Sequence, residues 1–148
     1  MKVLIIGANG QLGKSLYNTK PENLDIISYS KEEFNLLDIE NCLTKIEKVK
    51  PNYVINAAAY TAVDKAETET ELVEVVNAKN PYKIANTLDK LGCKFIQIST
   101  DFVFSGLKSS PYQTNDELLP LNEYGKSKAL CEELLLKLNN TKITSKLT

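Results

Sequence analysis

The sequence predicts an α/β fold with a doubly wound parallel sheet, and three observations carry that prediction. Residues 3–6 form an uninterrupted apolar run, as in a strand covered on both faces. Gly7, Gly10 and Gly13 follow at intervals of three, where a helix can begin. Apolar strand patterns then alternate with helical patterns along the rest of the chain. Such alternation predicts βαβ units with right-handed crossovers.

The elements expected in order are as follows. The strands cover residues 3–6, 23–28, 52–57 and 94–99. The helices cover residues 11–17, 39–48, 71–76, 81–91 and 122–138. Pro51 and Gly92 follow two of these helices, as residues that end helices often do. Residues 139–148 are polar apart from Ile143 and Leu147, and fit either a fifth strand cut short or a frayed end.

Composition is that of one globular domain. The chain has 148 residues, of which 43% are hydrophobic and 25% charged. Its 18 basic and 19 acidic residues are well mixed, which predicts no surface for nucleic acid or an anionic membrane. No apolar stretch approaches the roughly 20 residues of a membrane span, and the first residues do not form a signal peptide. We therefore expect a cytoplasmic protein.

The cysteine and histidine content limits the kinds of metal site and catalytic mechanism that the chain can have. Cys42, Cys93 and Cys131 are far apart and form no C-x-x-C pair, so they are expected to be reduced thiols. The chain contains no histidine. This excludes the usual zinc sites and the histidine-based triads. Any catalysis must use tyrosine, lysine, serine, threonine or carboxylates.

The glycine turn fits a dinucleotide phosphate site. Gly7 would form the tight turn, Gly10 would admit a pyrophosphate close to the backbone, and Gly13 would let the helix pack on the strand. Gln11 and Leu12 would begin that helix and offer free N–H groups to the phosphates. The alternative is an ordinary glycine-rich turn.

The segment after the second strand bears on cofactor choice. No carboxylate occurs there before Glu32, whereas Ser30 and Lys31 suit a 2′-phosphate. NADPH is therefore favoured over NADH, with a solvated loop as the alternative. Asp38 precedes the second helix, and capping that helix is a safer interpretation than contact with adenine.

Small residues follow the third strand. Ala57, Ala58 and Ala59, with Tyr60, would let a flat cofactor lie against the backbone. Close packing against a helix would also explain them, and both explanations can hold.

A catalytic set is suggested by the last strand and helix. Thr100 follows the fourth strand, and Tyr124 and Lys128 stand four apart on one helical face. A tyrosine whose pKa is lowered by a nearby ammonium can pass a proton to a carbonyl oxygen as hydride reaches the carbon. Thr100 would hydrogen-bond the same oxygen.

Several blocks together resemble a known family. They are residues 7–13, 56–67, 76–78, 99–104 with Gly106, and 120–128. In them the chain is similar to the dTDP-4-dehydrorhamnose reductases, a family of extended short-chain dehydrogenases. The block Thr-Ala-Val-Asp-Lys-Ala-Glu at 61–67 is specific to this family, whereas the glycine turn and the Tyr–Lys pair are more widely shared.

The resemblance implies an activity and roles for residues. It implies reduction of the 4-keto group of dTDP-4-dehydro-L-rhamnose to dTDP-L-rhamnose by NADPH, with NADH as the alternative donor. Thr100, Tyr124 and Lys128 match the catalytic residues, and Lys128 would also hold the nicotinamide ribose. Val63 and Phe102 would lie on the substrate side.

Four departures from the family pattern follow. Phe102 replaces a usual tyrosine, so one hydroxyl toward the substrate is absent. Cys131 replaces a common glycine, which we interpret as a packing change. Ser15 stands where some members carry a metal-binding carboxylate, so no metal is expected. Family members are about twice as long. Residues 1–148 are thus expected to be an incomplete NAD(P)-binding Rossmann domain, truncated before the substrate-binding region, whose tail does not continue convincingly into the family's next strand.

Two other functions remain open at this point. One is a non-catalytic nucleotide-binding or regulatory module of the same fold, against which the intact catalytic set argues. The other is a sibling sugar-nucleotide epimerase or dehydratase, which would share the Tyr–Lys pair but not block 61–67. The expected partner is a dTDP-sugar. A homo-oligomer is left open, and an unfinished sheet is expected to self-associate through its exposed edge.

Overall fold

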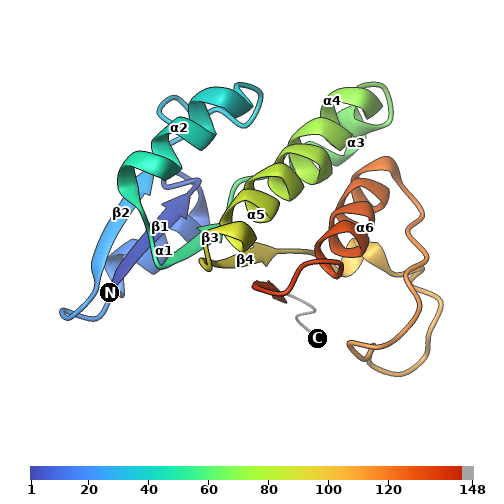
Figure 1. The fold of residues 1–148 in the computed structure, drawn as a ribbon. Coiled ribbons are helices and arrows are strands. Elements are labelled where there is room, and N and C mark those ends of the chain that lie inside the picture. The colour runs from blue at the N-terminus through green and yellow to red at the C-terminus, as the bar shows by residue number, and fades with distance from the viewer. Residues whose placement is uncertain (145–148) are drawn as a thin grey trace.

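A computed structural model describes residues 1–144 and contains a five-stranded, wholly parallel sheet (Figure 1). The strands are β1 (Lys2–Ile6), β2 (Asp25–Tyr29), β3 (Tyr53–Asn56), β4 (Lys94–Ile98) and β5 (Thr141–Thr144). Their order in the sheet is β2-β1-β3-β4-β5, so the direction of winding reverses between β1 and β3. Doubly wound sheets bind ligands at the carboxyl ends of the strands beside such a switch point. The doubly wound α/β fold predicted from the sequence is confirmed.

The helical segments lie on both faces of this sheet. They are α1 (Gln11–Asn18), α2 (Ile39–Val49), α3 (Val63–Ala66), α4 (Thr70–Glu74), η1 (Val75–Lys79), α5 (Asn80–Lys90), η2 (Asp101–Val103) and α6 (Glu123–Leu135). Helices α2, α5 and α6 pack side by side over one face (Figure 1). Because β1 leads to β2 in one direction and β2 leads back to β3, right-handed crossovers put α1 on the opposite face.

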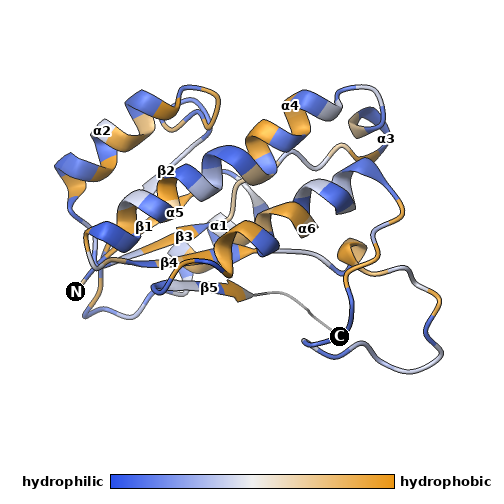
Figure 2. Ribbon diagram, turned by 45° about the vertical axis from the view of Figure 1, so that its right-hand side comes forward, coloured by the Kyte–Doolittle hydropathy of each residue, from blue (hydrophilic) through white to orange (hydrophobic). Residues whose placement is uncertain are grey.

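The main core lies between the sheet and the layer formed by α2, α5 and α6. Alternate strand residues point into it because successive side chains of a strand face opposite sides. They meet apolar side chains of the three helices, and the middle strands are largely hydrophobic (Figure 2). The fully buried members include Leu4, Ile6, Val54, Phe95, Ile46, Leu88 and Leu135.

The opposite face of the sheet is only partly covered. Leu16 of α1 lies there with Val3 and Ile5, and the three line a hollow of about 230 Å³. Ile55 and Ile96, on β3 and β4, line the same hollow and are half-buried. Parallel sheets usually bury both faces, so this face is a surface that can associate.

The segment from residue 70 to 90 differs from the prediction of two separate helices. Helix α4 runs without a break through the π-helical η1 into α5. Pro81, which has no N–H to donate, lies at the start of α5 directly after the π-helical turn. The break expected between residues 76 and 81 is absent, because the π-helical turn of η1 continues the helix through these residues. Helix α3 and η2 were also unpredicted, because single turns have too few residues to show periodicity.

The end of the chain is more ordered than the sequence indicated. Helix α6 ends at Leu135 rather than at residue 138, and Thr141 Oγ1 donates to the Leu135 carbonyl at 2.8 Å. Residues 141–144 then form β5, paired with β4. Of the two alternatives expected for the tail, the structure shows the short fifth strand and not a frayed end over residues 141–144, although the match to the family's next strand had looked unconvincing. The strand is hard to recognise in the sequence because its residues are mostly polar. Only Ile143 is a large apolar residue, and it packs against the core. Residues 145–148, with Leu147, lie outside the described residues.

Candidate cofactor and active site

The turn after β1 has the geometry that its glycine spacing predicts. Gly7 has φ +93°, a conformation that side chains other than glycine rarely adopt. Its N–H and that of Ala8 donate to the Tyr29 carbonyl at 3.0 and 2.9 Å, which fixes the turn beside β2. A Cβ on Gly13 would lie 2.2 Å from the Gly7 carbonyl oxygen. Helix α1 can therefore lie this close to the turn only with glycine at position 13.

The amino end of α1 is open to an anion. Its N-cap residue, Gly10, makes no side-chain capping bond, and its first turn carries no acidic residue. By contrast, Asp38 caps α2 and Asn122 caps α6, accepting from backbone N–H groups at 3.3 and 2.7 Å. The exposed residues Gln11 and Leu12 thus begin a helix whose first N–H groups have no intrahelical acceptor. Such an end favours phosphate through its N–H groups and its dipole.

The alanine segment after β3 lies directly against the glycine turn. A Cβ on Gly7 would come within 2.8 Å of the Ala58 nitrogen. Ala57 N–H donates to the Ile6 carbonyl at 2.9 Å, and Ala58 N–H donates to Asn56 Oδ1 at 3.2 Å. Close packing of backbone on backbone therefore accounts for these small residues. The same packing places Ala57, Ala58 and Ala59 at the switch point.

A buried amide that the sequence argument passed over holds this segment to α6. Asn77, in the π-helical η1, accepts from Tyr60 N–H at 2.8 Å and donates to the Tyr60 carbonyl at 3.1 Å. It also donates to Ser127 Oγ at 3.0 Å, and Ser127 donates to the Tyr124 carbonyl at 2.7 Å. Asn77 thus connects the alanine segment to the helix of Tyr124. π turns often occur at functional sites.

The segment after β2 gives less support to a 2′-phosphate site than its composition suggested. Ser30 N–H donates to Glu33 Oε2 at 2.9 Å, and the Ser30 hydroxyl accepts from Glu33 N–H at 3.4 Å. These backbone and hydroxyl contacts of Ser30 lower the pKa of Glu33. Ser30 is thus engaged in its own turn. Lys31 is exposed beside it, and Asp38 performs the capping role described above.

The three expected catalytic residues come from two elements at the same edge of the sheet. Thr100 follows β4 and caps η2, accepting from Phe102 N–H at 3.3 Å. Tyr124 and Lys128 project from α6 and are 9% and 3% exposed. Helix α6 packs against η2, which brings the Tyr124 phenol within hydrogen-bonding reach of Thr100.

Burial controls the electrostatics of this group. It raises the pKa of Tyr124, while the hydrogen bond with Thr100 acts in the opposite direction and the charge of Asp101 reinforces the rise. Burial also lowers the pKa of Lys128, whose Nζ donates to the Ile98 carbonyl at 2.5 Å. The sequence predicted that Lys128 would lower the pKa of Tyr124. The structure differs, because Lys128 points to the end of β4 and desolvation of the phenol dominates.

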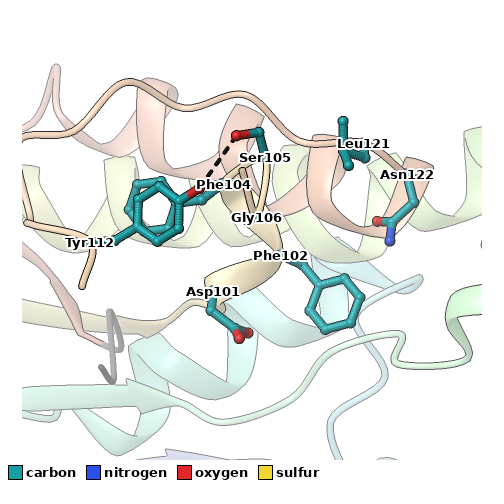
Figure 3. A pocket seen from close by; sticks show the side chains of 8 residues that line it. All are labelled: Asp101, Phe102, Phe104, Ser105, Gly106, Tyr112, Leu121 and Asn122. Atoms are coloured by element: carbon teal, nitrogen blue, oxygen red, sulfur yellow. Dashed lines mark hydrogen bonds between the residues drawn. The ribbon is translucent and has the colours of Figure 1, made fainter. Parts of the chain in front are cut away.

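Phe102 and Val63, the two residues expected on the substrate side, both pack near Tyr124. The Phe102 ring is 43% exposed and meets Tyr124 edge to face, with 5.7 Å between centroids. Phe102 also lines a pocket of about 290 Å³, in which Phe104 and Tyr112 lie stacked (Figure 3). Val63 packs on the small cluster of Ala66, Val73 and Tyr124. Both residues therefore border Tyr124.

Block 61–67 has a structural connection to the same helix. Glu67 Oε1 accepts from the Glu123 N–H at 2.9 Å, in the first turn of α6. A Cβ on Gly125 would lie 2.3 Å from the Phe102 carbonyl oxygen, so α6 sits directly on η2. Neither residue was singled out from the sequence. Glu67 and Gly125 could have been found from the sequence only because they lie in blocks 56–67 and 120–128, which resemble the family.

The described part of the chain contains neither a metal-binding cluster nor a membrane-spanning helix. Residues 1–144 contain no group of three or more histidine, cysteine or acidic side chains arranged to hold a metal. Within the same residues, no helix has the length and apolar character needed to cross a bilayer.

Comparison with known proteins gives a consistent result. The protein family described as "RmlD substrate binding domain" matches residues 1–145. A dTDP-4-dehydrorhamnose reductase of Burkholderia thailandensis is 41% identical over 132 residues, which are 89% of this chain and 44% of that protein. The crystal structure of a dTDP-4-dehydrorhamnose reductase from Clostridium acetobutylicum superimposes with a TM-score of 0.91 at 37% identity, over 97% of this chain and 52% of that one.

A second crystal structure adds a bound cofactor. The dTDP-4-dehydrorhamnose reductase of Bacillus anthracis, in complex with NADP, has a TM-score of 0.91 and 37% identity over 96% of this chain and 51% of that one. The chain thus spans about half the length of the relatives it matches.

Proposed function

Because this chain belongs to the dTDP-4-dehydrorhamnose reductase family, we propose that it binds NADPH and serves in reduction of the 4-keto group of dTDP-4-dehydro-L-rhamnose to dTDP-L-rhamnose. The observation that carries the proposal is the meeting of Thr100, Tyr124 and Lys128 at the same edge of the sheet as the uncapped end of α1. A phosphate-binding helix end and a buried proton donor at one edge are what a nicotinamide-dependent reductase requires.

The cofactor would be held by the turn, the alanine segment and α6. The N–H groups of Gln11, Leu12 and Gly13 would receive the pyrophosphate. The alanine segment would lie against the dinucleotide. Lys31 is the exposed cation after β2 that favours the 2′-phosphate of NADPH over NADH. The NADP complex of the Bacillus anthracis relative supports this preference.

The chemistry assigned to this chain is proton transfer and positioning. Bound NADPH would supply the hydride equivalent for the keto carbon C4 of the sugar and would be released as NADP⁺. The Tyr124 phenol donates its proton to the C4 oxygen, so that the carbonyl becomes a hydroxyl, and solvent later returns a proton to Tyr124. Thr100 donates a hydrogen bond to the same oxygen as charge develops there. Lys128 holds the nicotinamide ribose. Phe102 and Val63 border the sugar.

Two alternatives use the same fold. In a regulatory module the chain would bind the nucleotide and transfer no hydride. A sugar-nucleotide epimerase or dehydratase would share Tyr124 and Lys128, but block 61–67 and its contact with α6 favour the reductase. We place the protein in the cytoplasm, since its three cysteines are unpaired.

The test is consumption of NADPH in the presence of dTDP-4-dehydro-L-rhamnose by a full-length version of the protein, which carries the substrate-binding region of its relatives. Tyr124→Phe removes the proton donor and keeps the ring, so the rate should fall at least about 100-fold. Tyr17→Phe, at an exposed position on α1, is the matched control and should leave the rate unchanged. Equal rates for both variants would refute the assigned mechanism. NADPH binding without consumption would instead favour the regulatory module.

A further inference from the structure

Glu132 is a buried acidic residue that the proposed reaction does not use. It is 3% exposed and lies one helical turn after Lys128 on α6, so the two side chains share a face. Ser99 Oγ donates a hydrogen bond to Glu132 Oε1. A carboxylate is strongly disfavoured inside a protein unless hydrogen bonds or an opposite charge compensate for it.

Lys128 and Glu132 connect α6 to two consecutive residues of the chain at the end of β4. Lys128 Nζ donates to the Ile98 carbonyl, at the last residue of β4, and Glu132 accepts from Ser99, the next residue. Thr100 comes immediately afterwards. A buried cation and a buried anion therefore fix the backbone that presents the Thr100 hydroxyl.

The charge near Lys128 comes from its own helix. Cys131 and Glu132 are the groups whose negative charge would raise the pKa of Lys128 against the effect of burial. Burial raises the pKa of Cys131 to about 12, so this thiol is neutral at physiological pH. Glu132 is then the group that supplies the charge.

Elements packed against α6 carry further charged side chains. Several of these groups, with neighbours from the adjoining segments, have contacts elsewhere. Asp101 accepts from Thr100, Glu67 from Glu123 N–H, Glu69 from Tyr60 and Asp89 from Asn140 N–H, while Lys79 pairs with Glu74.

We propose that Glu132 is a positioning residue of the reductase site: its carboxylate balances the buried Lys128 ammonium and, through Ser99, sets the place of Thr100. The assignment of a role in reduction rests on the proposed function. The interaction between Glu132 and Lys128 does not, and it can be measured without cofactor or substrate.

The experiment is an NMR titration of the lysine side chains in the 148-residue chain, with the Lys128 signal assigned by its loss in Lys128→Arg. Glu132→Gln keeps an oxygen that can accept from Ser99 but removes the charge. Its Lys128 should titrate about 1 pH unit below wild type. Glu133→Gln removes the same charge from the exposed neighbouring position and should leave Lys128 unchanged, because solvent screens that charge.

A second variant separates charge from hydrogen bonding. Ser99→Ala leaves the Glu132 charge in place, so Lys128 should titrate at or above its wild-type value. A Lys128 titration unchanged by Glu132→Gln, or lowered by Ser99→Ala, would overturn the proposal. Because neither reading involves NADPH, a failure of cofactor binding leaves both results interpretable.

Discussion

Among the three glycines of the turn after β1, Gly13 leaves the least room for a Cβ, and a single added methyl group tests this close packing. In Gly13→Ala the new Cβ would lie 2.2 Å from the Gly7 carbonyl oxygen, so α1 must shift away from the turn. We expect a loss of about 1–3 kcal/mol in the free energy of unfolding. Urea unfolding followed by circular dichroism measures it, and Lys14→Ala, one residue later and exposed, is the control. Equal midpoints for the two variants would show that the turn is looser than described.

The three thiols should differ in reactivity. Cys42 and Cys131 are buried, and burial raises the pKa of their thiols to about 11 and about 12. Cys93 is only partly buried. Since the thiolate is the reactive form, a disulfide reagent at neutral pH should modify Cys93 first and the other two only after unfolding. Rapid modification of all three in the native protein contradicts this assignment; Cys93→Ser should remove the native reaction.

The same two thiols make the fold sensitive to alkali. Their pKa is raised above the ordinary value of 9.0 in the folded chain, so their contribution to stability is complete below pH 9 and is lost as pH rises through about 11–12. The melting temperature should therefore fall across this interval. In Cys42→Ala the fall should be shallower. A slope identical to that of the wild type would mean that Cys42 does not contribute.

Single residues also show what sequence reasoning can and cannot find. Thr100, Tyr124 and Lys128 could be proposed as a catalytic set because their types and spacing imply a chemistry, and the structure places them at one edge of the sheet. Asn77 and Glu132 were not, because their partners Ser127 and Ser99 are 50 and 33 residues away in the chain. A polar residue that is buried by such a contact looks the same in the sequence as one on the surface.

At the scale of elements, the π-helical η1 is the connection between the alanine segment and α6. Asn77→Ala would leave Tyr60 N–H and the Tyr60 carbonyl without their partner. We expect a loss of about 1–3 kcal/mol in stability, together with faster hydrogen exchange at the Tyr60 amide. Asn18→Ala, on the exposed end of α1, is the control. Unchanged exchange at Tyr60 would show that Asn77 does not hold this segment.

The elements differ in how visible they are in the sequence. Strands β1, β3 and β4 were predicted within one residue at each end, since apolar runs mark strands that are buried. Helix α2 was predicted as closely, from its apolar periodicity and from Asp38. Strand β5 was only one of two alternatives for the tail, and it had no predicted bounds, because it lies at the edge of the sheet and places little more than Ile143 against the core. The continuous path from α4 to α5 was missed because a π turn has no sequence period of its own.

At the scale of the whole molecule, the open face of the sheet should govern behaviour in solution. Ile55 and Ile96 are half-buried on the face that carries α1, and β5 leaves an unpaired edge among the described residues. We expect the 148-residue chain to self-associate as its concentration rises, and Ile96→Gln to weaken that association. Light scattering at increasing concentration measures it. A monodisperse monomer at every concentration is the contrary result.

The central claim is that this chain is a dinucleotide-binding domain that prefers NADPH. Titrating it with NADPH and with NADH, and following nicotinamide fluorescence, tests that claim directly. We predict saturable binding of one NADPH per chain and weaker binding of NADH. Affinity should fall markedly in Gly10→Ala, because the added Cβ would lie 3.3 Å from the Gly7 carbonyl oxygen at the amino end of α1, but not in Ser15→Ala on the exposed side of α1. If neither nucleotide bound to the folded chain, the claim would be wrong.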